Sequence, residues 1–368
     1  MGFELYSEEQ RVRITLSQKA FLIINEDMER FHISSRSTFM NTVFHNFYPS
    51  ARSSPTLYMD DQKAKLQHIA STDLSCSDSP EHISSLGNDE VREKVVKHFL
   101  LYEEKHLQDD LRSQMKTKGR YGETSRIYRI NTENLRYLLS EECEEAEYYQ
   151  DRPGLYLKCI LEEYAALPYI KREHIFFKSK YDIVSQALRE EKLLKITTGR
   201  KTYKVWPFSL EADALSTREY LTGLSQDIKS PDARKSCASF RIPNAKDIKL
   251  LRQSGKLTQA ERELLKEAIS SRTVQFLFGE EEEIHVRLTE EGVHKYNSQI
   301  YMRPAYVEKL ADKNEYIFRC TLRQAEYYFF KFGKDAEILS PDRLRSHFQT
   351  LYKDALAVYS SEDAEALT

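Results

Sequence analysis

The residues best suited to chemistry are cations and aromatic rings within residues 178–256. This window holds 17 Lys and Arg against nine Asp and Glu, whereas the whole chain of 368 residues has a net charge of −3. A guanidinium group can donate two hydrogen bonds to one phosphate, and aromatic rings can stack on bases. We therefore predict a binding site for a polyanion, of which nucleic acid is the commonest. The candidate residues are Arg200, Lys201, Tyr203, Lys204, Trp206, Tyr220, Arg234, Lys235 and Arg241; for Trp206 and Tyr220 the alternative is packing in the core.

No catalytic constellation accompanies these residues. The sequence lacks a phosphate-cradling glycine loop, a nucleophile elbow and metal-ligand spacing. The five cysteines are scattered, without metal-ligand or redox spacing. We therefore expect a binding protein with no enzymatic activity, no metal and no cofactor. The cysteine pattern and the absence of a signal pattern or a membrane-spanning apolar run predict a cytoplasmic protein that does not enter a membrane.

Short β-prone runs separated by turns must position the basic residues. We expect five strands, which suggest a small barrel of the Sm-like kind. Their predicted ranges are 193–197, 202–210, 218–225, 239–242 and 248–251.

A second group of cations lies near the N-terminus, on a strictly alternating strand. Val12, Ile14 and Leu16 point to one side, and Arg11, Arg13 and Thr15 to the other. Helices are expected at residues 18–31 and 36–48. One short strand leaves an unpaired edge, so a second strand must pair with it.

The same chain contains a second strand that could pair with the first. Residues 126–130 predict a strand with Tyr128 and Ile130 toward the core and Ile127 and Arg129 outward. Helices at 132–148 and 155–167 follow. The order repeats the first unit, so we predict a pseudo-dimer folded within one chain.

The segments around these units complete the predicted organisation. A loop at 71–88 and a charged helix at 89–116 precede a basic, glycine-bearing loop at 116–122, where Tyr121 could stack on bases. The C-terminal third predicts strands at 274–278, 284–288, 305–310, 316–320 and 336–339, with helices at 258–271, 290–297, 322–330 and 342–359. This is an α+β layer of the ferredoxin-like kind. We expect an α+β multidomain chain with segments at 1–52, 53–119, 120–177, 178–256 and 257–368.

Residues 10–48 resemble a ribbon-helix-helix unit. In that family the outward side chains of a paired strand ribbon read nucleic acid, and the N-terminus of the second helix grips a phosphate. The resemblance implies readout by Arg11, Arg13, Thr15 and Arg129, and a clamp of Ser34, Ser35 and Arg36. The alternative is an ordinary edge strand with solvated arginines.

Residues 178–252 resemble a WYL domain. The proline-bearing strand is Tyr203-Lys-Val-Trp-Pro-Phe208, the name-giving tripeptide is Glu219-Tyr220-Leu221, and the Phe-Arg strand is Ser239-Phe240-Arg241-Ile242. Three positions depart from the family: Glu219 replaces Trp, Ala238 replaces an Arg, and Tyr203 occupies the basic position ahead of the proline, with Lys204 beside it. The resemblance implies nucleic-acid or nucleotide-like ligands.

The C-terminal third resembles the extension that follows WYL domains. Phe332-Gly333, Glu337-Ile-Leu-Ser-Pro341 and Leu344-Arg345 carry this likeness. In that family the extension commonly mediates dimerisation, so a homodimer is expected.

Two functions follow from these resemblances. The arrangement is similar to accessory proteins of type VI-D CRISPR RNA-guided ribonucleases, which implies single-stranded RNA binding and stimulation of the nuclease. The alternative is a transcription regulator whose ribbon binds duplex operator DNA and whose WYL domain senses a ligand. The weak net charge of residues 1–52, with six basic and six acidic residues, favours the first.

Overall fold

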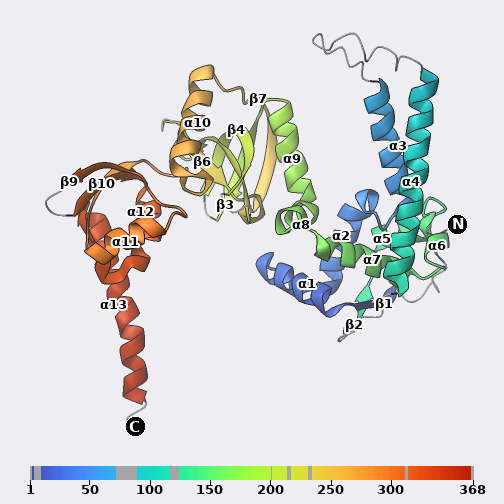
Figure 1. The fold of residues 1–368 in the computed structure, drawn as a ribbon, viewed down its shortest axis with the longest axis horizontal. Helices are drawn as coiled ribbons and strands as arrows, with labels where there is room; N and C mark the ends of the chain where they lie inside the picture. The colour runs from blue at the N-terminus through green and yellow to red at the C-terminus, as the bar shows by residue number, and fades with distance from the viewer. Residues whose placement is uncertain are drawn as a thin grey trace. The chain divides into compact units, whose positions relative to one another are not determined.

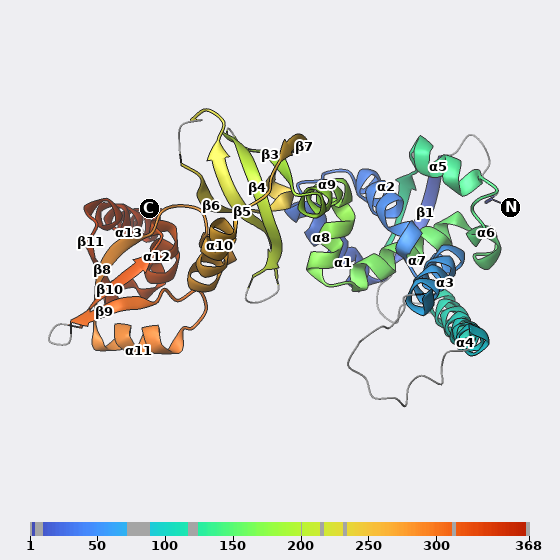
Figure 2. The ribbon, with the colours of Figure 1, turned by 90° about the horizontal axis from the view of Figure 1, so that it is seen from above.

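The chain forms helices and three small antiparallel sheets. The computed structural model describes residues 2–3, 10–71, 89–116, 124–199, 201–213, 217–230, 234–310 and 314–365. The described sheets have two, five and four strands, which confirms the predicted α+β class. The chain divides into two compact units, Met1–Lys178 and Ser179–Thr368 (Figures 1 and 2). No helix within the described ranges is long and apolar enough to cross a membrane.

The first unit is mainly helical around one two-stranded sheet. Its elements are β1 (Arg11–Leu16), α1 (Gln18–Arg30), α2 (Arg36–Phe47), η1 (Tyr48–Ser50), α3 (Pro55–Ser71), α4 (Asp89–Lys116), β2 (Thr124–Arg129), α5 (Thr132–Leu139), α6 (Glu145–Tyr148), α7 (Pro153–Ala166) and α8 (Tyr169–Phe176). Serine hydroxyls cap the N-termini of two of its helices. Ser17 Oγ accepts a hydrogen bond from Ala20 N at the start of α1, and Ser35 Oγ accepts one from Thr38 N at the start of α2.

Strands β1 and β2 pair antiparallel within one chain, as predicted. Arg11 lies opposite Arg129, and Leu16 opposite Thr124. Tyr128 is buried and Ile127 is 62% exposed, so the alternation sets the inner and outer faces of the ribbon as expected. Helix α7 packs against β1, α1 and α2. Figure 1 shows α3 and α4 side by side.

The helix predicted at 132–148 is wrong, because the chain leaves the helical conformation at Ser140. That residue has an extended backbone (φ −75°, ψ 155°), and its Oγ donates to Tyr137 O at 2.7 Å. A side chain that bonds the preceding turn offers the backbone an alternative to the helix. Helices α5 and α6 therefore replace the single helix.

A buried ion pair lies among the helices of the first unit. Arg172 Nε lies 2.7 Å from Asp27 Oδ2, and the Tyr164 hydroxyl donates to the same oxygen at 2.9 Å. Asp27 is fully buried. Because an unpaired buried charge is costly, these three side chains fix α1 against α7 and α8.

The second unit begins with α9 and a five-stranded sheet. The strands are ordered β6-β5-β4-β3-β7 and are all antiparallel. All five predicted strands are present, but among the described residues the edge strands β6 and β7 do not pair, so the sheet does not close into the predicted barrel. The elements are α9 (Lys178–Arg189), β3 (Lys192–Thr198), β4 (Lys201–Ala212), β5 (Glu219–Asp227), β6 (Ser236–Phe240), η3 (Ile242–Asn244) and β7 (Asp247–Ser254).

A four-stranded layer follows. Its strands have the order β11-β8-β10-β9, so the chain runs β-α-β-β-α-β through the layer, as the ferredoxin-like prediction requires. Helix α10 opens with the predicted capping box of Thr258 and Glu261. The elements are α10 (Gln259–Arg272), η4 (Val274–Phe276), β8 (Glu282–Leu288), α11 (Glu290–Ser298), β9 (Tyr306–Leu310), β10 (Glu315–Cys320), α12 (Leu322–Phe329), η5 (Phe330–Asp335), β11 (Ala336–Ser340) and α13 (Asp342–Glu365).

The strand predicted at 274–278 is wrong. Val274, Phe276 and Phe278 alternate with other residues as in a strand, but Val274–Phe276 is a 3₁₀ helix. Thr273, just before it, has φ 62° and ends α10. Leu277 is fully buried together with Phe276, a pattern that a half-exposed strand does not give.

Candidate nucleic-acid interface

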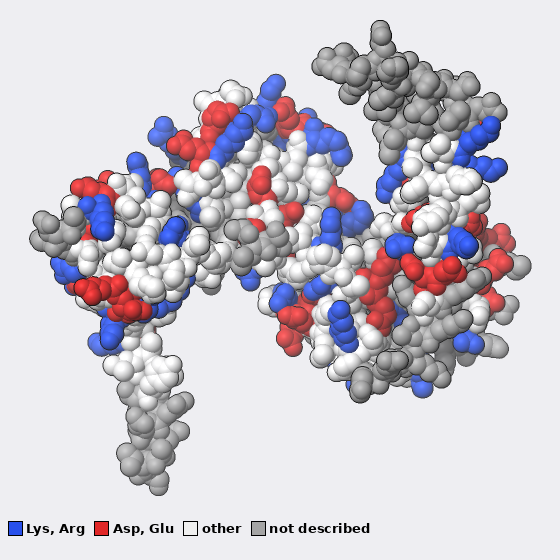
Figure 3. Space-filling model, viewed as in Figure 1, with Lys and Arg blue, Asp and Glu red and all other residues white. Residues whose placement is uncertain are grey.

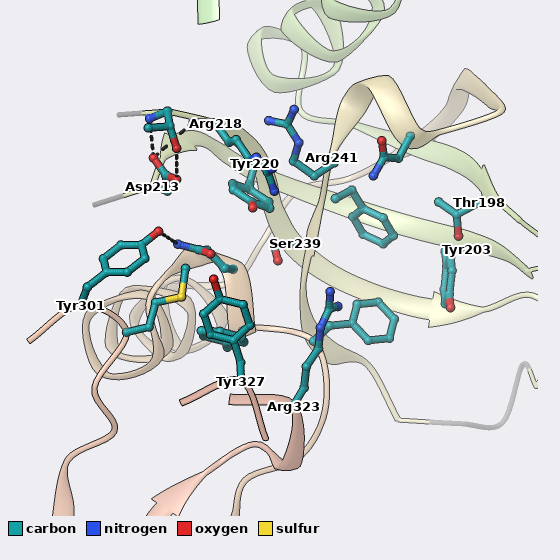
Figure 4. A pocket seen from close by; sticks show the side chains of 17 residues that line it. Thr198, Tyr203, Asp213, Arg218, Tyr220, Ser239, Arg241, Tyr301, Arg323 and Tyr327 are labelled. Atoms are coloured by element: carbon teal, nitrogen blue, oxygen red, sulfur yellow. Dashed lines mark hydrogen bonds between the residues drawn. The ribbon is translucent and has the colours of Figure 1, made fainter. Parts of the chain in front are cut away.

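The second unit contains a cavity of about 590 Å³ between the five-stranded sheet and the elements that follow it. Figure 4 shows Arg218, Tyr220 and Arg241 on one side and Tyr301, Arg323 and Tyr327 on the other. We call this cavity the arginine–tyrosine pocket. It is lined by Thr198, Tyr203, Asp213, Thr217, Arg218, Tyr220, Ser239, Phe240, Arg241, Asn244, Gln275, Phe276, Phe278, Tyr301, Met302, Arg323 and Tyr327.

The charge of the pocket is positive. Its lining includes three arginines and one carboxylate, that of Asp213. The Asp213 carboxylate is buried and accepts hydrogen bonds from Thr217 N and Thr217 Oγ1, both at 2.6 Å, and from Arg218 N at 3.2 Å. Because the carboxylate accepts these three hydrogen bonds, it stabilises the backbone at Thr217 and Arg218.

The three arginines reach the pocket from different segments. Arg218 precedes β5, and Arg241 follows β6. Arg241 Nη1 donates to Glu219 O at 2.9 Å, and its guanidinium lies 5.4 Å from the centre of the Tyr220 ring. Arg323 lies in the first turn of α12, and its guanidinium has no hydrogen-bond or ion-pair partner within the described part of the chain.

Aromatic rings form much of the remaining wall. The Tyr203, Phe240 and Phe278 rings form a cluster with centroid distances of 5.5, 5.6 and 6.0 Å. Burial raises the pKa of the Tyr203 and Tyr220 hydroxyls, against the opposing effect of Arg241 and Arg218 on Tyr220. Both hydroxyls therefore remain protonated at neutral pH and can donate hydrogen bonds. Tyr327 is 57% exposed, so its ring is accessible to a ligand.

The structure divides the predicted basic residues between two faces. Tyr203, Tyr220 and Arg241 line the pocket. Lys204 follows Tyr203 in β4 and points to the other side of the sheet, as alternation requires. Lys201 and Arg234 are exposed and lie outside the pocket lining, and Arg200 lies outside the described residues.

The second face contains Trp206. Its ring is buried against a core of Leu193, Leu224 and α10 residues, which is the packing alternative considered for it. Lys204 and Lys235 lie over the ring, 5.3 and 4.4 Å from its centre. Lys235 also bonds Glu261 of α10 at 2.8 Å, so these cations contribute to packing α10 on the sheet.

Several pocket residues were not predicted from the sequence. Arg218 adjoins the tripeptide Glu219-Tyr220-Leu221, a signal that could have identified it. Arg323, Tyr301 and Tyr327 lie about a hundred residues further along the chain, and the sequence alone gives no indication that they face Tyr220.

The ribbon of the first unit presents its own cations. Arg11, Arg13 and Arg129 are exposed on its outer face, and Thr15 Oγ1 donates to Ser125 Oγ at 3.2 Å. At the start of α2, the Ser35 hydroxyl caps the helix.

A pair of guanidiniums lies beside this ribbon. Arg36, next to Ser35, and Arg126 both lie over the Phe21 ring, at 5.5 and 5.6 Å. Figure 3 shows Lys and Arg interspersed with Asp and Glu over the drawn face of each unit, so on that face the charge forms no single basic surface.

A solved structure shares the fold over nearly the whole length of the chain. The crystal structure of a CRISPR Cas-related protein is 22% identical, with a TM-score of 0.66; the match covers 96% of this chain and 94% of that one. A second match, proteasome accessory factor B/C (PafBC) of Arthrobacter aurescens, is 16% identical over 64% of this chain and 37% of that one, and its TM-score of 0.28 supports no statement about the fold. No family model and no curated protein matches.

Proposed function

We propose that this chain is a non-catalytic protein that binds single-stranded RNA and stimulates a CRISPR RNA-guided ribonuclease. The observation that carries the proposal is the arginine–tyrosine pocket: among the described residues that line it are three arginines, several tyrosines and one carboxylate, which already accepts hydrogen bonds from Thr217. Cations with interleaved rings suit single strands, because each base offers a face for stacking. The fold shared with a CRISPR Cas-related protein supports the CRISPR association.

The proposal also assigns a domain type to each unit and names the effector. The second unit is then a WYL module with its C-terminal extension, and the ribbon with its helices is a ribbon-helix-helix pair. The type VI-D ribonuclease is the expected effector. The test is whether the chain increases the RNA-cleavage rate of that nuclease in a reconstituted reaction.

The binding test compares two matched pairs of substitutions. Arg218→Ala with Arg323→Ala removes two cations from the pocket, and Lys249→Ala with Arg252→Ala removes two exposed cations of β7 outside it. Fluorescence anisotropy with labelled single-stranded RNA over a salt series gives the affinity and its salt dependence.

Each lost phosphate contact reduces the slope of log affinity against log salt by about 0.7 for single strands. We expect the pocket pair to weaken binding strongly and to reduce the slope by up to about 1.4. We expect the β7 pair to change both much less. Equal effects of the two pairs would argue against the pocket as the RNA site.

A second function is favoured by the ribbon. Its outer face exposes Arg11, Arg13 and Arg129, which suit the groove and phosphates of duplex DNA. In this alternative the chain regulates transcription. Arg11→Ala with Arg13→Ala should then reduce affinity for duplex DNA and leave RNA affinity nearly unchanged. Duplex binding without RNA binding would favour this alternative over the first.

A further inference from the structure

The charge of the arginine–tyrosine pocket indicates which kind of phosphate it takes. A phosphodiester within a strand carries one negative charge and two free oxygens. A terminal phosphate monoester carries close to two charges at neutral pH and has three strong acceptor oxygens. Arg218, Arg241 and Arg323 supply three guanidiniums to one cavity, and the Asp213 carboxylate already accepts two hydrogen bonds from Thr217. Three cations match the monoester better than the diester.

The size of the pocket suits the end of a nucleic-acid strand better than a long internal segment of one. Its volume of about 590 Å³ lies within the range of roughly 300–1,000 Å³ that holds one small ligand. A strand that binds along a groove instead spreads its contacts over several nucleotides. Tyr220 and Tyr327 provide rings for the base of a single terminal nucleotide.

The wall opposite the sheet is built on constrained backbone. Met302 lines the pocket with φ 60°, and Thr273, two residues before the lining residue Gln275, has φ 62°. Non-glycine residues rarely adopt such angles, and they persist where the surroundings enforce them. The Gln275 amide donates to the Tyr301 hydroxyl at 3.2 Å, which further fixes this wall. The pocket is therefore largely preformed.

We infer that the pocket binds the phosphorylated end of an RNA strand, or a free nucleotide with the same phosphate monoester. The inference rests on the proposed RNA binding and deepens it. Arg218 and Arg241 hold the phosphate from the sheet side, and Arg323 holds it from α12. Both the five-stranded sheet and the four-stranded layer then contribute to one ligand.

The experiment uses the full chain and one RNA sequence in four forms: with a 5′-phosphate, with a 3′-phosphate, with hydroxyls at both ends, and circularised. Anisotropy gives the affinity for each linear form, and competition gives it for the circle and for a nucleoside monophosphate against its nucleoside. Arg323→Ala is the pocket variant, and Arg252→Ala is the control with the same loss of charge.

We expect one phosphorylated end to bind about tenfold or more tightly than the hydroxyl and circular forms, because charge-assisted bonds to the dianion are lost without it. Arg323→Ala should reduce this preference to under about twofold, whereas Arg252→Ala should keep it. Competition by the monophosphate alone, with no end preference in RNA, would identify a free nucleotide as the ligand.

Equal affinity for all four RNA forms, with no competition by the monophosphate, overturns the inference and leaves the proposed RNA binding in place. Failure of every RNA form to bind removes the proposed function itself.

Discussion

At the scale of single residues, the pocket shows how position in a strand decides the role of a cation. Tyr203 and Lys204 are adjacent in sequence, but they lie on opposite faces of β4. A count of charges in a sequence window cannot separate the two faces of a strand. The alternation of the strand contained that information, since it predicts that only one of the two can face the pocket.

A buried carboxylate in the first unit predicts a pH dependence. Glu145 is fully buried, and burial raises its pKa above the ordinary 4.5, although a hydrogen bond from the Tyr137 hydroxyl opposes the shift. Just above pH 4.5 the folded state therefore keeps a proton that the unfolded state has lost. The free energy of unfolding falls as pH rises through this window.

The substitution Glu145→Gln removes the titrating group. The variant should be more stable than the parent chain at pH 8, and the difference should shrink towards pH 4, where Glu145 is mostly protonated in both the folded and the unfolded chain. Urea unfolding followed by circular dichroism at both pH values measures this. A constant difference between the two proteins would contradict the prediction.

At the scale of elements, the ribbon depends on a close approach between β1 and α7. A Cβ added at Gly154, near the start of α7, would lie 2.7 Å from Arg13 O and 3.1 Å from Val12 Cγ2. The first distance is shorter than real Cβ contacts and involves the backbone, and the second is tight enough that the Val12 side chain must shift. The glycine therefore lets the helix pack directly on the strand.

We expect Gly154→Ala to destabilise the first unit by about 1–3 kcal/mol, because the helix and strand must separate. Denaturant unfolding of the full chain measures the change. Gly199→Ala is the control: that site has φ 52° and lies in the second unit, so the strain of the substitution falls there and the stability of the first unit should be unchanged. If the first unit of Gly154→Ala unfolds at the same denaturant concentration as in the parent chain, the close approach of α7 and β1 does not require glycine.

The sequence predicted elements better than their assembly. Alternating residues predicted β1, β-prone runs between turns predicted the strands of the five-stranded sheet, and the Thr258 cap predicted the start of α10. The errors at residues 132–148 and 274–278 arose where local side-chain bonds or a positive φ override periodicity. The wall formed by Tyr301 and Arg323 could not be predicted, because only tertiary packing brings it to Tyr220.

At the scale of the whole molecule, helix α13 offers a surface for the homodimer expected from the sequence. Helix α13 buries Leu344 and Phe348, but Leu356, Val358 and Tyr359 further along it are 66, 61 and 72% exposed. Several exposed apolar side chains along one helix suit a contact with a second copy of this chain.

We predict a dimer at micromolar concentration by light scattering, and a monomer for Leu356→Glu with Tyr359→Glu, because the substitutions would bury charges in the contact. Leu264→Glu on α10, at a residue that is 50% exposed, is the matched control and should remain dimeric. A monomeric parent chain, or a dimeric double variant, would exclude this interface.

The pairing of β1 with β2 inside one chain has a consequence for evolution. In a dimer of identical subunits, each mutation changes both halves of a ribbon, so its surface stays symmetric and suits palindromes. Here the halves are encoded separately, and their outer faces differ: β1 presents Arg11, Arg13 and Thr15, whereas the paired positions of β2 present Arg129, Ile127 and Ser125. Selection can therefore alter one side without altering the other, and the ribbon is free to fit a target that has no two-fold symmetry.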